Sequence, residues 1–122
     1  MSHVSQSALS VERHLMPEGV VLLQLGGIID AKTFEQLEGA VQDVLTRGGN
    51  RLIVDLSGIG YISSAGIGVL LYAMGETRRA KGDLVLVGLQ PTVLEVFDSL
   101  HLISLFILKQ DVTEAALVFR KP

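Results

Sequence analysis

Hydrophobic residues along the chain fall into short strand-like runs separated by helical stripes. Residues 20–25, 51–56 and 84–87 are short and almost entirely apolar runs, and the second of them is rich in β-branched side chains. Runs of this length are typical of strands buried on both faces of a sheet. Weaker alternation at residues 11–16, followed by the turn residues 17–19, predicts an edge strand that opens an antiparallel hairpin.

Helical periodicity fills the segments between these strands. One helix is expected from Asp30, a good N-cap residue, to about Arg47, after which two glycines follow. A second is expected over residues 64–81, and a third begins at Pro91, because proline suits the first turn of a helix. Apolar side chains recur on one face of the first helix at helical spacing: Phe34, Leu37, Val41, Val44 and Leu45.

The C-terminal part adds one more strand and one more helix. Residues 105–108 form an apolar run, and Asp111 and Glu114 have the spacing of a capping box before a helix that ends near Phe119. Strands alternating with helices predict an α/β fold with parallel neighbours. We therefore expect one domain over residues 9–120, with a four- to five-stranded mixed, mostly parallel sheet and about four helices, after a flexible tail at residues 1–8.

Composition narrows the class of protein without changing this architecture. The 122 residues are 48% hydrophobic, which is enough for one core and too much for a disordered chain. A formal net charge of −3 provides no basic surface for phosphate backbones, so no nucleic-acid partner is expected. The absence of cysteine excludes disulfides and thiol catalysis.

Targeting and membrane signals are weak. The N-terminus lacks the basic and apolar regions of a signal peptide. Residues 56–75 carry no charge and match the length of a membrane span, but their serines and glycines favour a strand, a tight loop and a buried helix. We therefore expect a cytoplasmic protein with no membrane partner.

The candidate chemistry lies between the third strand and the helix that follows it. In open α/β sheets, functional residues usually lie in loops beyond the carboxyl ends of the strands. Residues 57–64 are expected to form a loop of this kind. Ser63 and Ser64 have two interpretations, an N-cap and a phosphorylation site, because a helix N-terminus tolerates added negative charge. Asp55 interrupts an apolar strand, and we interpret it as an acceptor that orders the loop.

No enzyme motif is complete in this segment. Gly58 and Gly60 match part of a dinucleotide-binding loop, but Ser63 occupies the position of its third glycine, and no lysine follows to make a P-loop. Ile62 replaces the first glycine of a nucleophile elbow. We therefore expect a protein without catalytic activity, cofactor or metal. None of the histidines has the spacing of a triad or metal site: His3, His14 and His101.

Two segments resemble the signature of STAS domains, most closely the bacterial anti-sigma factor antagonist group. Residues 52–57 read Leu-Ile-Val-Asp-Leu-Ser, and residues 61–68 read Tyr-Ile-Ser-Ser-Ala-Gly-Ile-Gly. The family has an apolar strand ending in Asp-Leu-Ser, then an aromatic, an aliphatic and Asp-Ser-[Ser/Ala]-Gly-[Leu/Ile]-Gly. Residues 27–30 are similar to its Gly-x-[Leu/Ile]-Asp. The resemblance spans roughly residues 10–118 and departs at Ser63, where the family has aspartate.

The resemblance implies a partner switch. An unmodified antagonist binds an anti-sigma factor, which is also a serine kinase, and so frees a sigma factor that directs transcription. Phosphorylation ends the complex, and a serine phosphatase resets it. By alignment the acceptor is Ser64, with Ser63 as the rival. Two other classes stay open: a scaffold STAS subunit of a larger signalling assembly, and a module that binds a small anion or nucleotide.

The expected docking surface combines the motif with the helix after it. That helix is apolar on a second side, at Val69, Tyr72 and Ala73, which favours a second contact surface, although a fully buried helix would show the same pattern. The residues expected to contact the partner are Asp30, Ser57, Gly58, Gly60, Ser63, Ser64, Ala65, Gly66, Tyr72, Gly75, Glu76 and Arg79.

Overall fold

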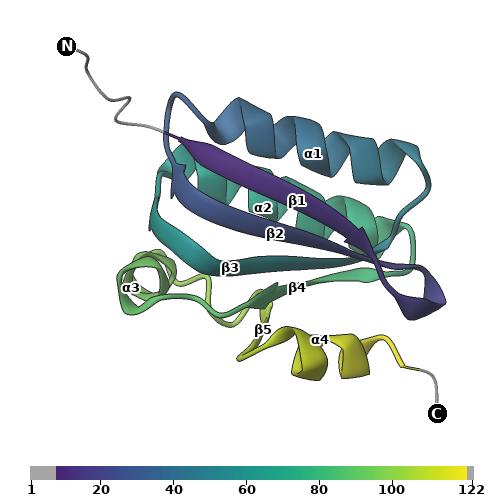
Figure 1. Cartoon of the computed structure of the whole chain (residues 1–122). Helices are drawn as coiled ribbons and strands as arrows, with labels where there is room; N and C mark the ends of the chain where they lie inside the picture. The colour runs from purple at the N-terminus through teal and green to yellow at the C-terminus, as the bar shows by residue number, and fades with distance from the viewer. Residues whose placement is uncertain (1–7, 121–122) are drawn as a thin grey trace.

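The computed structural model describes residues 8–120, and within them strands alternate with helices as expected (Figure 1). Five strands form one sheet in the order β1-β2-β3-β4-β5, antiparallel between β1 and β2 and parallel elsewhere. This confirms the mixed α/β fold with four helices; the tail expected at the N-terminus lies, for residues 1–7, outside the described part. The elements are β1 (Leu9–Leu15), the 3-10 turn η1 (Pro17–Gly19), β2 (Val20–Ile29), α1 (Phe34–Thr46), β3 (Arg51–Ile62), α2 (Ser64–Arg79), β4 (Asp83–Val87), α3 (Pro91–Ser99), β5 (Ile107–Lys109) and α4 (Val112–Val118).

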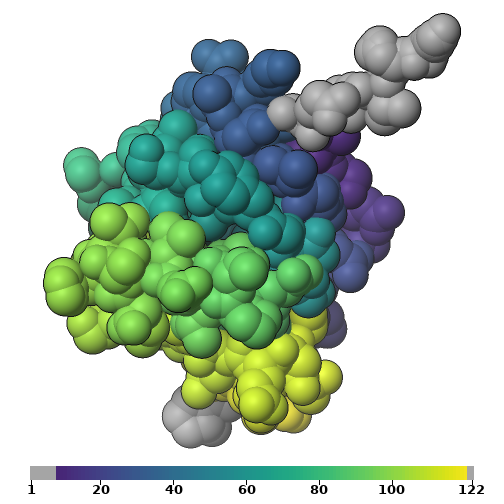
Figure 2. Space-filling model, turned by 90° about the vertical axis from the view of Figure 1, so that its left-hand side faces the viewer, coloured from purple at the N-terminus to yellow at the C-terminus, as the bar shows by residue number. Residues whose placement is uncertain are grey.

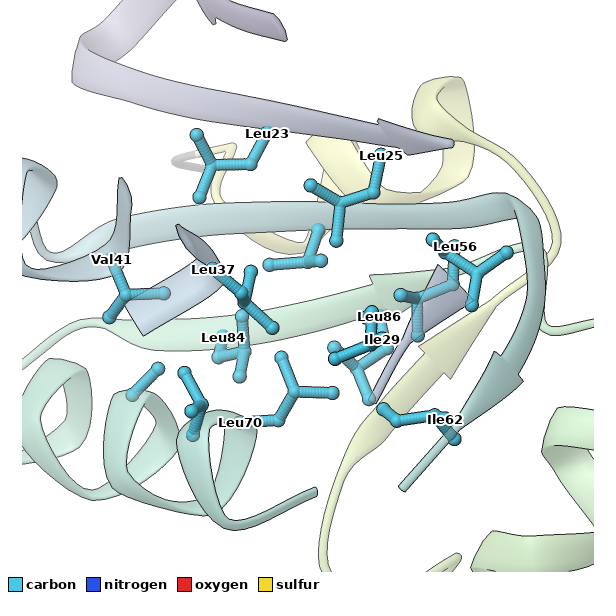
Figure 3. Packing of buried hydrophobic residues seen from close by; sticks show 14 of the residues in the cluster. Leu23, Leu25, Ile29, Leu37, Val41, Leu56, Ile62, Leu70, Leu84 and Leu86 are labelled. Carbon is cyan, nitrogen blue, oxygen red and sulfur yellow. The ribbon is translucent and has the colours of Figure 1, made fainter. Parts of the chain in front are cut away.

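Different helices cover the two faces of the sheet. Alternate side chains of each strand point to opposite faces, so Leu52 and Val54 join the core under α1 and α2, while Ile53 joins a smaller cluster with Ala115 of α4. Figure 3 shows the larger core, where Leu70 of α2 faces the strand side chains. Burial of both faces of β3 confirms the central strand expected there.

The segment expected as a loop at residues 57–64 is instead largely strand. β3 continues to Ile62, so the loop prediction was wrong for residues 57–62. The physical reason is the length of β2, which runs to Ile29 and pairs with this glycine-rich segment, as in Ile28 with Tyr61. A backbone partner determines strand length where side chains alone read as a turn.

Asp30 is not the N-cap of α1, as the sequence predicted. The helix begins at Phe34, and Thr33 occupies the N-cap position. The Asp30 carboxylate accepts a hydrogen bond from the Lys32 N–H at 2.9 Å, and its carbonyl accepts from the Phe34 N–H at 2.9 Å. Aspartate forms such local turns as readily as it caps helices, so here it orders the turn before the helix.

The ends of the other elements agree more closely with those predicted from the sequence. Pro91 opens α3, and the Asp111 carboxylate accepts the Glu114 N–H at 2.9 Å as the N-cap of α4. The edge strand begins two residues earlier than predicted, at Leu9, and the last strand begins two residues later, at Ile107. No helix within residues 8–120 combines the length and hydrophobicity needed to cross a membrane.

Candidate docking surface at the start of α2

Two irregularities in β3 shape the end of the sheet. Between Asp55 and Gly58, β3 has one residue more than the paired part of β2, and a second extra residue, Gly60, lies opposite the step from Gly27 to Ile28. Bulges of this kind bend a strand and turn its side chains in new directions. The Asp55 carboxylate, 7% exposed, accepts the Ser57 N–H at 2.9 Å at the first irregularity. This confirms Asp55 as a backbone-ordering acceptor.

Glycine at position 66 allows α2 to start directly against the sheet. A Cβ added to Gly66 would lie 2.5 Å from the Cγ2 atom of Ile29 and 2.9 Å from the Cγ1 atom of Ile62. Real Cβ atoms essentially never come so close to two core side chains, so any other residue would push the helix away from the sheet. Gly66 is buried, and it lets the first turn of α2 lie directly against the sheet.

The two adjacent serines have different roles in the helix start. Ser63 is the N-cap: its hydroxyl accepts the Gly66 N–H at 3.3 Å, and its own N–H donates to the Ile29 carbonyl at 2.8 Å. Ser64 is the first residue of α2 and is exposed. Among residues 8–120, no side-chain hydrogen bond engages its hydroxyl. Of the two interpretations, the cap therefore falls on Ser63, and Ser64 carries the accessible hydroxyl.

The exposed stripe of α2 begins at Ser64 and runs toward its C-terminus. Gly68 and Gly75 lie on it in open space, with Tyr72, which is 44% exposed, between them. The Tyr72 hydroxyl accepts a hydrogen bond from the Gln42 side chain of α1 at 3.1 Å, which fixes the ring between the two helices. Further along, Glu76 and Arg79 form an ion pair at 3.3 Å.

The second apolar side of α2 is not a free surface. Val69 and Ala73 are buried in the main core, because α1 packs beside α2 on the same face of the sheet. Of the two interpretations of this apolar side, burial inside the domain is therefore the one that applies to Val69 and Ala73. Of the three residues that form this side, only Tyr72 is exposed.

Tyr61 is an exposed aromatic residue near the start of α2 that the sequence analysis did not name as a candidate contact. Its side chain is 52% exposed at the bulged end of β3, three residues before Ser64. The start of α3 supports this strand end, since the Thr92 hydroxyl donates to the Gly60 carbonyl at 3.3 Å and the Gln90 amide donates to the Ser57 carbonyl at 2.7 Å. The sequence signal that could have indicated an exposed aromatic side chain here was a tyrosine among the glycines at the end of the strand.

The predicted contacts form a strip rather than one compact patch. Asp30 follows the end of β2 and Ser63 follows the end of β3, where the Ser63 N–H bonds to the Ile29 carbonyl. Ser57 and Gly58 lie within β3 instead, five and four residues before its end at Ile62. Figure 2 looks onto this end, where the teal β3–α2 segment forms a band between the blue of α1 and the green of α3. Arg79, by contrast, lies about 22 Å along the helix from Ser64, at 1.5 Å per residue.

This fold and helix start define an STAS domain, and a family model described as "STAS domain" matches residues 15–115. The chain therefore belongs to the STAS domain family. A Bordetella bronchiseptica protein, provisionally named anti-sigma factor antagonist BtrV, is 34% identical over 103 residues, which cover 84% of this chain and 89% of that protein.

Solved structures share the same fold at lower sequence identity. An anti-sigma factor antagonist from Mycobacterium paratuberculosis has a TM-score of 0.86 and 21% identity, covering 96% of this chain and 98% of that one. The Bacillus cell fate determinant SpoIIAA in its phosphorylated form has a TM-score of 0.73 and 21% identity, covering 91% and 100%. Proteins named as anti-sigma factor antagonists thus share both sequence and fold with this chain.

Proposed function

We propose that this protein is an anti-sigma factor antagonist that acts by reversible binding, without catalysis of its own, in the bacterial cytoplasm. Its partner is an anti-sigma factor that is also a serine kinase, and binding releases a sigma factor. Phosphorylation of Ser64 ends the complex, and a serine phosphatase restores it. The observation that carries this proposal is the exposed Ser64 hydroxyl at the start of α2, beside a Ser63 hydroxyl that already caps the helix.

Exposed glycines on α2 support docking along this helix. Glycine inside a helix costs about 1 kcal/mol relative to alanine. Nothing lies within 4 Å of a Cβ added at Gly68 or Gly75, so the domain itself does not require glycine there. If the backbone of a partner approaches the helix closely, a side chain at either position would block that approach, which explains glycine at both.

Two exposed tyrosines supply anchors on either side of the acceptor. Tyr61 precedes Ser64 on the bulged strand end, and Tyr72 lies two helical turns after it. Tyrosine is enriched among residues that dominate binding energy, because its ring buries a large area with few rotatable bonds. The proposed surface therefore centres on Ser64 between Tyr61 and Tyr72.

Phosphate on Ser64 would act through charge rather than through a change of fold. A phosphoserine adds about −1.5 to −2 charges, which the N–H groups at the start of α2 tolerate. In a docked interface the same charge must lose its water. A penalty of about 3–4 kcal/mol weakens binding by roughly 100- to 1,000-fold. Because Ser63 replaces the family's aspartate, no carboxylate adjoins the phosphate within the helix cap.

A pull-down from the native host tests the partner. Wild-type protein, Ser64→Ala and Ser64→Asp are used as baits, and mass spectrometry identifies the bound proteins. We expect Ser64→Ala to capture an anti-sigma factor with a kinase domain at least as well as wild type, and Ser64→Asp to capture little. Capture of other STAS proteins in a large complex, with no kinase, would instead support the scaffold alternative and contradict the proposal.

The phosphorylation step has a separate test. The captured kinase is incubated with ATP and the wild-type, Ser63→Ala or Ser64→Ala protein, and the phosphosite is mapped. We expect phosphate on Ser64 in wild type and in Ser63→Ala, and none in Ser64→Ala. Phosphate on Ser63 alone would overturn the assignment of the acceptor. An unphosphorylated protein that still binds tightly would be a binding module without this switch.

A further inference from the structure

Strand β1 leaves one edge of the sheet open. It is first in the strand order, and its pairing with β2 is regular, without the shifts found between β2 and β3. At the two ends of the ladder the Ala8 carbonyl accepts the Ile28 N–H at 2.9 Å, and the Met16 N–H donates to the Val20 carbonyl at 2.8 Å. In an antiparallel ladder, successive residues turn their backbone N–H and C=O groups alternately toward and away from the partner strand. The backbone groups of the even-numbered residues of β1 therefore bond to β2, and those of the odd-numbered residues face the open edge.

Contacts along the outer edge agree with this alternation. The Leu9 carbonyl points outward and accepts a hydrogen bond from the Gln36 side chain of α1 at 2.9 Å. Beyond Leu9, no described residue bonds to the outward backbone groups of Val11, Arg13 or Leu15. The open edge therefore comprises residues 11–15. Natural edges are protected by bulges, prolines, short strands or charged side chains. This segment has no bulge and no proline, so its protection against pairing rests on its short length and on Glu12, Arg13 and His14.

We propose that residues 11–15 pair antiparallel with the same residues of a second copy of this chain, centred on Arg13. A two-fold axis perpendicular to the sheet relates the strands. Arg13 exchanges its N–H and carbonyl with Arg13 of the second copy, and Val11 does so with Leu15 of the second copy. The two sheets then become one, and the unpaired backbone groups of both edges are satisfied.

The Glu12–His14 pairs favour this register over its two neighbours. Glu12 and His14 lie 3.4 Å apart in one chain, on the face that α4 partly covers. Centring on Arg13 places Glu12 opposite His14 of the second copy, twice over by symmetry. Centring on Glu12 would place two carboxylates opposite each other, and centring on His14 would do the same with two imidazoles, both of which are unfavourable when charged.

Apolar contact adds to the pairing on the other face. Leu15 is a large apolar side chain that is 73% exposed in the single chain. In this register it lies beside Val11 of the second copy. The two Arg13 side chains meet at the centre as like charges, but they are long and exposed and can separate. Five paired residues on each side bury little area, so the dimer is expected to be weak.

The arrangement keeps both proposed docking surfaces available. An axis perpendicular to the sheet leaves α1 and α2 of both copies on the same face, while antiparallel strands put the two Ser64 residues at opposite ends. The dimer would thus present two copies of the Ser64 surface without blocking either, which suits a bivalent partner.

Analytical ultracentrifugation of the full chain tests the proposal, at concentrations from about 10 μM to 1 mM. We expect wild type to shift toward a dimer as the concentration rises. Arg13→Pro removes an outward N–H but no bond to β2, so it should stay monomeric with an unchanged circular dichroism spectrum. Arg13→Ala, the matched control, keeps the N–H and should still dimerise.

A charge exchange tests the register. Glu12→Lys alone should weaken the dimer at least about tenfold, because a cation then faces His14 of the second copy. Adding His14→Glu should restore dimerisation, since the charges are complementary again with reversed polarity. A wild type that stays monomeric at about 1 mM, or an Arg13→Pro variant that dimerises like wild type, would overturn the edge proposal. A dimer that Glu12→Lys leaves unchanged would overturn the register.

Discussion

At the scale of the residue, the start of α2 separates two chemically identical side chains by position. Ser63 has extended backbone geometry and turns its hydroxyl into the helix, where it accepts the Gly66 N–H. Ser64 is the first residue of the helix and is exposed. A capping hydroxyl is occupied by the fold, and modification would remove its bond. An exposed first-turn hydroxyl can accept a phosphate without breaking any bond of the domain.

Two alanine substitutions measure this difference. Ser63→Ala should lower the free energy of unfolding by about 1 kcal/mol, because one N–H at the helix start loses its acceptor. Ser64→Ala should change it by less than about 0.5 kcal/mol. Urea denaturation followed by circular dichroism gives both values. Ser63→Asp serves as a control that keeps a capping oxygen and should resemble wild type. A larger loss for Ser64→Ala than for Ser63→Ala would contradict the cap assignment.

At the scale of the element, α2 has one side buried in the core and a second side exposed on the proposed docking surface. Its inner side packs Ile67 and Leu70 onto the sheet, and Val69 and Ala73 toward α1. The remaining narrow stripe is exposed and carries small residues at two positions where the fold leaves open space. Conformational stability alone favours alanine there, so we attribute the glycines to binding.

Glycine substitutions separate stability from binding. Gly68→Ala and Gly75→Ala should each raise the free energy of unfolding by about 0.5–1 kcal/mol, since neither has a left-handed backbone. Both should weaken binding of the captured anti-sigma factor, measured by calorimetry. Gly39→Ala is the matched control: Gly39 is equally open but lies on α1, so the same stabilisation should leave binding unchanged. Equal binding by all three variants would place the docking surface elsewhere.

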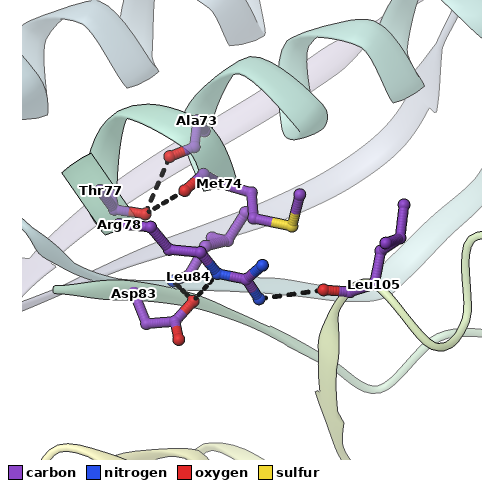
Figure 4. A network of polar contacts seen from close by, with 7 residues as sticks. All are labelled: Ala73, Met74, Thr77, Arg78, Asp83, Leu84 and Leu105. Atoms are coloured by element: carbon purple, nitrogen blue, oxygen red, sulfur yellow. Dashed lines mark hydrogen bonds and ion pairs between the residues drawn. The ribbon is translucent and has the colours of Figure 1, made fainter.

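At the scale of the whole molecule, Arg78 links the end of α2 both to the nearby start of β4 and to Leu105, which is 27 residues away in sequence (Figure 4). From the last turn of α2, its Nε atom lies 2.9 Å from the Asp83 carboxylate at the start of β4, and its terminal nitrogen donates to the Leu105 carbonyl at 2.9 Å. The neighbouring Thr77 hydroxyl stays inside the helix, bonded to the Ala73 carbonyl at 2.9 Å. Arg78 thereby holds the segment before β5 against the end of α2.

Removing this link should loosen that segment without unfolding the domain. Arg78→Ala is expected to speed amide hydrogen exchange around Leu105 several-fold, because local opening then loses fewer interactions. Arg79→Ala is the control, since its ion pair with Glu76 stays within one helix and should leave exchange around Leu105 unchanged. Hydrogen exchange with mass spectrometry compares the two. Equal exchange in Arg78→Ala and wild type would show that packing alone holds the segment.

Local patterns in the sequence were enough for the order and type of the elements. The buried runs, the proline at the start of α3 and the aspartate cap of α4 act through neighbours within a few residues, so the chain itself contains their physical cause. Asp55 as a backbone acceptor follows from the cost of burying an unpaired carboxylate. The motif around Ser64 predicts a candidate site between a strand and a helix, and the structure has the end of β3 and the start of α2 there.

Tertiary structure alone decided where strands end and which side chains meet solvent. β3 extends to Ile62 because β2 supplies backbone partners, and Val69 is buried because α1 lies beside it. Tyr61 stays exposed because the bulge at Gly60 re-directs the strand end. Each outcome depends on a segment far away in the sequence, and a periodicity reports which faces are apolar without saying what covers them.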